Sequence, residues 1–426
     1  MFIHIRRIPT LKKTLTIIFS VLILSNFVLA SGFQINEHGA RAMSLGGAFT
    51  GLANDASAVF FNPAGITQLN GTNFMGGVTL IQPISSFRGP SPSIAESKLE
   101  DQVFTPINLY ITHKINDDLS AGFSVNNPYG LGTKWDPDWV GRYLAIETEI
   151  RTFYFTGVLA YKISDQLSVG AGAVFAYGDV IIARKTSLTP FAGEALIHLE
   201  GDGSAFGFTA GLLYNPIPEV SFGINYRSQA DIEFEGDGTA TGPEQAMALL
   251  PTGSISAPLS APSNLVFGLA VNAIENLTIT ADIQFVGWSS YDKLQLTFND
   301  VFDENGDKLV ETSIRDYENS FISRLGCEYK LNEEWDLRAG VLYDVNPVSD
   351  ERVDPTLPDS DRLGLNVGFG YKITENISLD LAYFFLRFDE RKITNSLESY
   401  SDGAAPFNGV YNSTAHLFGI NFSYKL

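Results

Sequence analysis

The last eleven residues of the chain, His416 to Leu426, alternate between two kinds of side chain. Phe418, Ile420, Phe422, Tyr424 and Leu426 are aromatic or aliphatic, and Gly419, Asn421, Ser423 and Lys425 lie between them. Successive residues of a β-strand point to opposite faces of a sheet. The segment therefore predicts a strand with one face suited to lipid and the other suited to water, which is typical of a membrane-spanning β-barrel.

The N-terminus has the features of a secretory signal. Arg6, Arg7, Lys12 and Lys13 precede an apolar stretch over residues 15–29, and small residues follow before Ser31. Residues 1–30 are predicted to be a cleaved signal peptide and are left out of the fold. After them no apolar run approaches the roughly 20 residues that a membrane helix needs, so a soluble secreted protein is the alternative to a barrel.

From Gly71 onward, segments with this two-residue period alternate with turns. Short turns lie near residues 116–118, 164–166, 216–219, 275–276, 332–334 and 374–376, and long connections near 88–102, 131–146, 185–203, 237–262, 299–313, 347–360 and 396–410. Short turns at one end and long loops at the other are typical of an outer-membrane barrel. The alternation predicts an all-β fold, a 14-stranded antiparallel transmembrane β-barrel over residues 71–426, whereas a soluble sandwich gives no reason for it.

Residues 31–70 break this pattern. Small residues dominate positions 39–53, and the apolar side chains include Phe33, Leu45 and Phe49. A fourteen-stranded barrel is too wide to be filled by its own side chains. We therefore expect this segment to form a mostly helical hatch inside the lumen, with a position in the periplasm as the alternative.

Composition excludes several classes of partner and chemistry. The formal net charge is −20 and the leader adds only positive charge, which argues against nucleic acid as a partner. The single cysteine, Cys327, excludes an internal disulfide, and the five histidines stand in no nucleophile or metal motif. We expect no catalytic residue, no metal and no cofactor. The expected partners are outer-membrane lipid and lipopolysaccharide, and the chain is expected to be a monomer.

Several segments, in the same order along the chain, closely resemble the outer-membrane long-chain fatty acid and hydrophobic compound transporter family (FadL/TodX type, OMPP1). They are residues 32–37, 54–57, 62–66, 127–131, 139–143, 347–348, 357–362 and 417–422. The resemblance implies a plugged fourteen-stranded barrel in the outer membrane of a Gram-negative bacterium, carrying hydrophobic molecules inward. Long-chain fatty acids are the first expected substrate, and neutral aromatic or aliphatic hydrocarbons are the alternative. An outer-membrane lipid hydrolase, a general porin and an adhesin are further alternatives, and the terminal Leu426 departs from the family's usual Phe.

Transport of an alkyl chain needs a continuous apolar path, because each buried methylene is worth about 0.8 kcal/mol. Two long loops offer an apolar landing site through Phe191, Leu249 and Leu250. Such exposed clusters often bind a ligand. The alternative is that the two loops pack on each other.

A way out through the wall is predicted at the end of one strand. The residues are Asn126, Asn127, Pro128, Tyr129 and Gly130. Pro128 has no N–H for a ladder bond and Gly130 favours a bulge, so strand pairing is expected to be interrupted. The resemblance implies a lateral opening there, and an ordinary strand end is the alternative.

The resemblance also implies basic residues that hold a ligand carboxylate in the lumen. One aligns with Arg184, which strand parity places inward, and the other falls on Gln295. The apolar parity changes after Gly287-Trp288, which predicts that Lys293 faces inward and can substitute. Lumenal salt bridges to acidic neighbours such as Asp282 are the alternative role.

Gating is assigned to the hatch. We expect ligand binding to shift the N-terminal residues Gly32, Phe33 and Gln34. Asn62, Pro63 and Ala64 form the second part of the family motif in the hatch. The sequence encodes no energy source, so movement is expected to run down a gradient.

Overall fold

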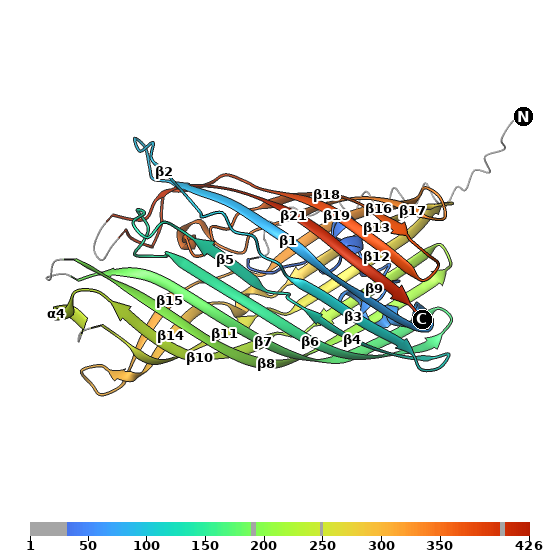
Figure 1. Ribbon diagram of the computed structural model, residues 1–426, viewed down its shortest axis with the longest axis horizontal. Helices are drawn as coiled ribbons and strands as arrows, with labels where there is room; N and C mark the ends of the chain where they lie inside the picture. The colour runs from blue at the N-terminus through green and yellow to red at the C-terminus, as the bar shows by residue number, and fades with distance from the viewer. Residues whose placement is uncertain (1–31, 189–192, 248–249, 401–404) are drawn as a thin grey trace, which may run out of the picture.

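The computed structural model describes residues 32–188, 193–247, 250–400 and 405–426, which form a closed antiparallel β-barrel (Figure 1). Within these ranges fourteen strands make the ring. They are β1 (Thr72–Arg88), β3 (Ile107–Lys114), β4 (Leu119–Asn126), β6 (Glu147–Ser164), β7 (Leu167–Ser187), β8 (Glu194–Ile217), β9 (Val220–Arg227), β12 (Asn264–Ile274), β13 (Leu277–Val286), β16 (Ser320–Lys330), β17 (Trp335–Asp344), β18 (Arg362–Lys372), β19 (Ile377–Phe388) and β21 (Gly409–Lys425). β21 pairs with β1 from Asn73↔Lys425 to Arg88↔Val410, which closes the ring. The predicted fourteen-stranded all-β fold is confirmed, while the predicted signal peptide lies outside the described residues.

The two-residue period of the sequence appears directly in the burial of side chains. On β21, Phe418, Phe422 and Tyr424 are exposed on the outside of the ring, whereas Leu417 and Asn421 are buried inside it. In this arrangement the backbone N–H and C=O groups of each strand bond to the neighbouring strands, while apolar side chains face lipid. Among the described residues, no helix is both long and apolar enough to cross a membrane.

One end of the ring carries additional short strands and helices (left in Figure 1). They are β2 (Glu96–Lys98), β5 (Gly130–Lys134), β10 (Ala230–Thr241), α4 (Glu244–Met247), β11 (Gly253–Ala261), η2 (Trp288–Ser290), β14 (Lys293–Phe302), β15 (Lys308–Ile314), η3 (Asp350–Arg352) and β20 (Arg391–Ile393). Much of what the sequence predicts as long loops is therefore paired strand. For example, β10 pairs with both β8 and β11. Extending the hairpins satisfies backbone hydrogen bonds that a loop would leave to water.

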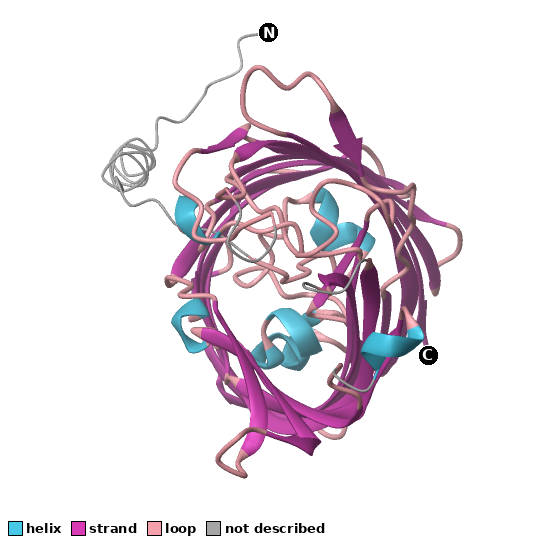
Figure 2. Ribbon diagram, turned by 90° about the vertical axis from the view of Figure 1, so that its left-hand side faces the viewer, coloured by secondary structure: helices cyan, strands magenta, loops and turns pink. Residues whose placement is uncertain are grey.

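Residues 32–71, here called the hatch, lie inside the ring, where Figure 2 shows short helices enclosed by strands. The hatch contains α2 (Ala40–Ser44), α3 (Ala58–Phe61) and η1 (Pro63–Gln68). Its apolar side chains form a small core in which Leu45, Phe49 and Val59 are fully buried. α2 lies against β18 and β19, and η1 lies against β6, β7 and β8. The hatch thus contacts walls on different sides of the lumen.

Pairs of glycines on neighbouring strands seat the hatch. Among the described residues these cross-strand pairs are Gly170–Gly211, Gly223–Gly268 and Gly326–Gly340. A Cβ at Gly170 would lie 2.6 Å from Ala64 N, one at Gly223 would lie 2.1 Å from Thr50 O, and one at Gly340 would lie 2.2 Å from Gly46 N. The hatch backbone therefore rests directly on the wall backbone, where a larger side chain has no room.

A valine at Gly340 is expected to unseat this part of the hatch without opening the ring. Overpacking at such a contact costs about 1–3 kcal/mol, so trypsin should cleave after the half-buried Arg41 about tenfold faster than in the wild type. Gly157→Val is the matched control, because a Cβ at Gly157 on β6 meets nothing within 4 Å. Equal protection of Arg41 in both variants would contradict the seating role of the glycine pair.

Candidate functional site

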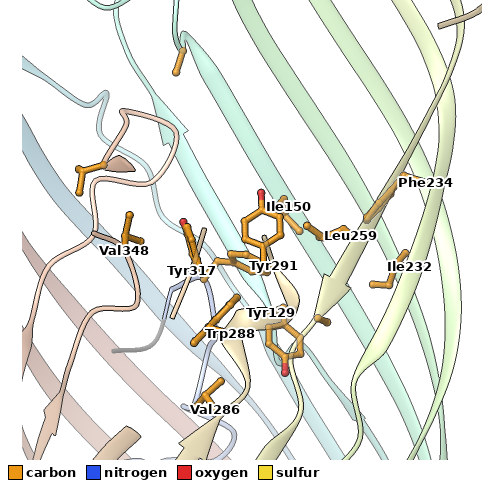
Figure 3. Packing of buried hydrophobic residues seen from close by; sticks show 14 of the residues in the cluster. Tyr129, Ile150, Ile232, Phe234, Leu259, Val286, Trp288, Tyr291, Tyr317 and Val348 are labelled. Carbon is orange, nitrogen blue, oxygen red and sulfur yellow. The ribbon is translucent and has the colours of Figure 1, made fainter. Parts of the chain in front are cut away.

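A cavity of about 400 Å³ lies in the lumen on the side of the hatch that faces the additional strands. We call it the lumenal cavity. Its lining is mostly apolar and includes Leu131, Ile150, Val180, Phe234, Leu259, Leu294 and Leu296. Aromatic rings of Phe33, Tyr291 and Tyr317 close it toward the hatch, within the cluster of buried side chains that Figure 3 shows. Such a space binds an alkyl or aryl group by removing it from water.

A second cavity, of about 410 Å³, crosses the barrel wall. We call it the lateral cavity. Leu342 and Phe384, which face the lumen from β17 and β19, line one part of it. Ile84 on β1 and Arg151 on β6, both exposed on the outside of the ring, line the other part. Because side chains from both faces of the wall border one space, the cavity connects the lumen with the outer surface of the barrel.

The wall is interrupted at the residues that the sequence singles out. β4 pairs with β6 up to Asn126↔Tyr154, and β5 resumes the pairing at Gly130↔Arg151. Three residues, 127–129, therefore stand opposite two, 152 and 153, which is the geometry of a β-bulge. Residues 126–130 are here called the kink. Whether a ligand passes there stays a prediction.

Side chains replace the missing ladder bonds at the kink. The Asn127 side chain donates from Nδ2 to Thr152 O at 2.6 Å and accepts at Oδ1 from Ile107 N at 2.8 Å. The Thr152 hydroxyl donates to Tyr129 O at 2.7 Å and accepts from Tyr129 N at 3.1 Å. Asn126, which is fully buried, donates to the Tyr110 hydroxyl. The side chains of Asn127 and Thr152 thus bond the backbone of the bulge to the wall, while Asn126 Oδ1 is buried without a partner.

The first described residues of the hatch pair with the inner edge of this kink. Ile35 N donates to Pro128 O at 2.9 Å, and Gly130 N donates to Phe33 O at 3.0 Å. Phe33 lines both cavities, and its ring lies 4.7 Å from that of Trp288 and 6.1 Å from that of Tyr129. Phe33 therefore lies between the two cavities, together with Leu131, Ile150 and Leu357, which also line both.

The rest of the hatch is held more firmly. Asn62 donates to Thr50 O and to Leu212 O, each at 3.0 Å, so it ties the hatch to β8. Pro63 and Ala64 lie against Gly170 on β7. These three predicted residues form an anchor, far from the cavities, whereas Gly32, Phe33 and Gln34 lie at them.

His38 marks the boundary between the two parts of the hatch. Burial lowers its pKa to about 3, assisted by the Arg227 guanidinium, so the imidazole is neutral. Its Nε2 lies 2.9 Å from Ile35 O, and its own carbonyl accepts from the Tyr110 hydroxyl at 2.7 Å. His38 thus connects the segment at the kink to the part of the hatch that rests on the wall.

Among the described residues, three arginines line the lumenal cavity; two of them are paired with a carboxylate, and the third, Arg352, has a buried Nε without a hydrogen-bond partner. Arg184 lines the cavity, and its Nη2 lies 2.6 Å from Glu311 Oε2 on β15. Arg315 pairs with Asp354. Burial raises the pKa of Glu398, which lies in the loop before β21. The cavity thus offers polar groups to a ligand, but Arg184 and Arg315 already bind a carboxylate.

The predicted inward orientation of Lys293 is wrong. Leu294 and Leu296 line the lumenal cavity, and the side chain of Lys293 is exposed. The parity changes because β14 lies beyond the apolar belt, where its leucines cover the mouth of the lumen instead of facing lipid. The apolar side of the strand is therefore its inner side here.

The predicted landing site is described only in part. Phe191 and Leu249 lie outside the described residues. Leu250 packs against Leu188, Ala195 and Ala246, so the described parts of the two loops contact each other. Binding of a ligand there stays a prediction.

Sequence reasoning missed the aromatic residues Trp288, Tyr291 and Tyr317, all of them buried beside Phe33. The change of parity after Gly287 is the signal that could have indicated them. It marks a place where the wall leaves the regular strand and turns side chains inward.

The fold and these cavities define a membrane-spanning barrel with an apolar cavity in its lumen and a second cavity at its wall. Residues 21–426 match the family model described as outer membrane protein transport protein (OMPP1/FadL/TodX). The chain belongs to this family, and it is a transport protein of the outer membrane.

Relatives and solved structures agree with this assignment. The chain is 27% identical to the long-chain fatty acid transport protein of Escherichia coli O6:H1, over 95% of this chain and 96% of the relative. It is also 27% identical to outer membrane protein P1 of Haemophilus influenzae, over 93% and 95%. The fold is similar to that of a Pseudomonas aeruginosa FadL homologue (TM-score 0.81, 23% identity, 93% of this chain and 100% of that one). It is similar also to the toluene transporter TodX of Pseudomonas putida (TM-score 0.73, 17% identity, 94% and 99%).

Removing the partner of Arg184 tests whether this ion pair lowers the affinity of the cavity for a carboxylate ligand. In Glu311→Gln, Arg184 has no carboxylate to bind, so the affinity for 1-pyrenedodecanoate should rise about tenfold by fluorescence titration in detergent. The affinity for the uncharged 1-dodecylpyrene should stay within about twofold. The double variant Arg184→Gln/Glu311→Gln should lose the gain, and a gain that persists there would contradict the role of this ion pair.

Proposed function

We propose that the protein mediates passive uptake of hydrophobic compounds, which bind in the lumenal cavity and leave through the lateral cavity into the membrane. The observation that carries this proposal is the meeting of the two cavities at Phe33, because the second cavity crosses the wall at the kink. An apolar ligand can then travel without entering water, and each shielded methylene is worth about 0.8 kcal/mol. Transport runs down a concentration gradient.

Long-chain fatty acids are the first proposed substrate, since curated relatives that match nearly the whole chain carry that name. A neutral hydrocarbon is the second candidate. It is favoured by the pairing of Arg184 with Glu311, which occupies the cation that a fatty-acid carboxylate would need. A carboxylate taken from water into an apolar cavity without a free partner loses its hydration, whereas a hydrocarbon does not.

Gating in this proposal is a movement of residues 32–35. A ligand that fills the lumenal cavity competes with the Phe33 ring for Trp288 and Tyr291. When Phe33 moves, the two cavities join. The anchor at Asn62 and the glycine pairs keep the rest of the hatch in the lumen, so no wide aqueous pore opens.

We further propose that one chain is sufficient, because both cavities are built from a single ring, and that lipopolysaccharide surrounds the outer part of the barrel. A catalytic role is not proposed, since the family is one of transport proteins. Hydrolysis of a lipid ester by the purified protein would argue for the alternative of an outer-membrane hydrolase.

Deletion of Pro128 is expected to close the lateral route. It leaves two residues opposite residues 152 and 153, so β4 and β5 can pair with β6 as one continuous strand. Uptake of 1-dodecylpyrene by cells that lack their own family members should fall to the level of cells without the protein. Binding of the probe to the purified variant should persist. Undiminished uptake by a folded variant would overturn the lateral route.

A reversible lock tests the movement of the hatch. A Cβ at Gly130 would lie 2.7 Å from Cδ1 and 3.7 Å from Cγ1 of Ile35, so cysteines at the two positions would bring their sulfur atoms close together. The variant Ile35→Cys/Gly130→Cys, made with Cys327→Ala, should take up no probe when oxidised and regain uptake when reduced. The two single cysteine variants are the controls, and equal uptake in the oxidised and reduced forms would contradict gating.

A further inference from the structure

The tip of the kink reaches across the lumen. Tyr129 is almost fully buried, and its hydroxyl donates to Pro262 O at 2.7 Å and accepts from Asn264 Nδ2 at 3.0 Å. Pro262 and Asn264 belong to the wall where β11 passes into β12, and β6, β7, β8 and β9 lie between that wall and the kink around the ring. A tyrosine side chain is much shorter than the bore of a fourteen-stranded barrel. The contact therefore requires that the kink, or the connection at Pro262, lies inside the line of the wall.

The acceptor lies at a second irregularity of the ring. β12 pairs with β13 up to Asn264↔Val286, while β11 pairs with β14 only at Ile255↔Phe298 and Ser256↔Thr297 among the described pairs. Asn264 is itself fixed, because its Oδ1 accepts from Gln284 of β13. The hydroxyl of Tyr129 thus connects the kink to a rigid point of the facing wall, and its ring lies 6.4 Å from that of Trp288 (Figure 3).

Two separate contacts consequently hold the kink inward. One is the pairing of Phe33 and Ile35 with residues 128–130, which belongs to the hatch. The other is the bond of Tyr129 to Pro262, in which both partners belong to the barrel. Movement of the hatch segment removes the first contact at the moment when a ligand must pass. The bond of Tyr129 to Pro262 then remains and holds the tip of the kink toward the lumen.

We propose that Tyr129 is a positioning residue that holds the lateral route open while the N-terminal segment of the hatch is displaced. This proposal rests on the proposed function. The hydroxyl touches no ligand in this role. It acts through the backbone of the kink, whose position sets the width of the lateral cavity.

The test is a double-mutant cycle of Tyr129→Phe with deletion of residues 32–35, which removes the hatch contact permanently. In the full-length chain, Tyr129→Phe should lower uptake of 1-dodecylpyrene by at most about twofold, because the hatch still holds the kink. In the deletion background the same substitution should lower it by about fivefold or more. Uptake of the slimmer hexadecane should fall less than that of the pyrene probe in the same variant, since a narrower opening excludes the bulkier molecule first.

Tyr154→Phe is the matched control. Tyr154 lies on β6, its ring is 5.8 Å from the ring of Tyr129, and it is equally buried. Thermal unfolding and probe binding are measured for every variant. Equal effects of Tyr129→Phe in both backgrounds, or the same loss in Tyr154→Phe, would overturn the positioning role. Absence of uptake by the wild type would instead overturn the proposed function, and the positioning role with it.

Discussion

Backbone N–H and C=O groups in lipid find no water, so a membrane-spanning chain must satisfy them within the protein. The pairing of β21 with β1 does this for the ring as a whole. The kink is the place where the ladder fails, and there the requirement is met by Asn127, by Thr152 and by the N-terminal segment of the hatch. The need to hydrogen-bond the backbone of the kink therefore links the lateral cavity to the hatch. The opening in the wall is stable because a part of the hatch completes its hydrogen bonds.

In the proposed gating, the hatch combines a fixed part and a displaceable part. The fixed part rests on glycine pairs and carries a buried charge network, in which Arg41 and Arg338 both bind Glu328 and Arg338 also binds Asp380. Breaking a buried pair of this kind costs several kcal/mol, because it leaves an unpaired charge away from water. The residues before His38 have few such contacts. This contrast allows the passage to change while the lumen stays closed to solutes in water.

Selectivity depends on a balance between apolar burial and charge. The lining of the lumenal cavity favours any long alkyl or aryl group, and area alone does not distinguish an acid from a hydrocarbon. In the proposed function, the distinction depends on whether an arginine of the cavity, Arg184 above all, is free to bind a carboxylate. Arg184 already binds Glu311, which lies 127 positions away in the sequence. We therefore expect the cavity to bind a carboxylate more weakly than it would if Arg184 had no partner.

Much of the fold follows from local sequence, because the two-residue period and the turn residues are properties of short segments. The strand number, the closing strand and the interruption at Pro128 were predictable for this reason. The positions of the site residues were less predictable from the sequence. The alternation of side chains along the strand correctly predicted that Arg184 points inward, but it was wrong for Lys293. The prediction assumes that the apolar side of a strand faces lipid, and this assumption does not hold beyond the membrane.

The sequence by itself determined that this chain forms a closed barrel, since the alternation of apolar and polar side chains specifies strands with one lipid-facing side, while it left open whether the first forty residues fill the lumen. Tertiary structure alone decided that Arg184 is neutralised, that Phe33 lies between two cavities and that Tyr129 bonds to the opposite wall. Each of these contacts joins residues distant in the chain, at distances set by the closure of the ring. Such distances cannot be predicted from the residue pattern of a short segment.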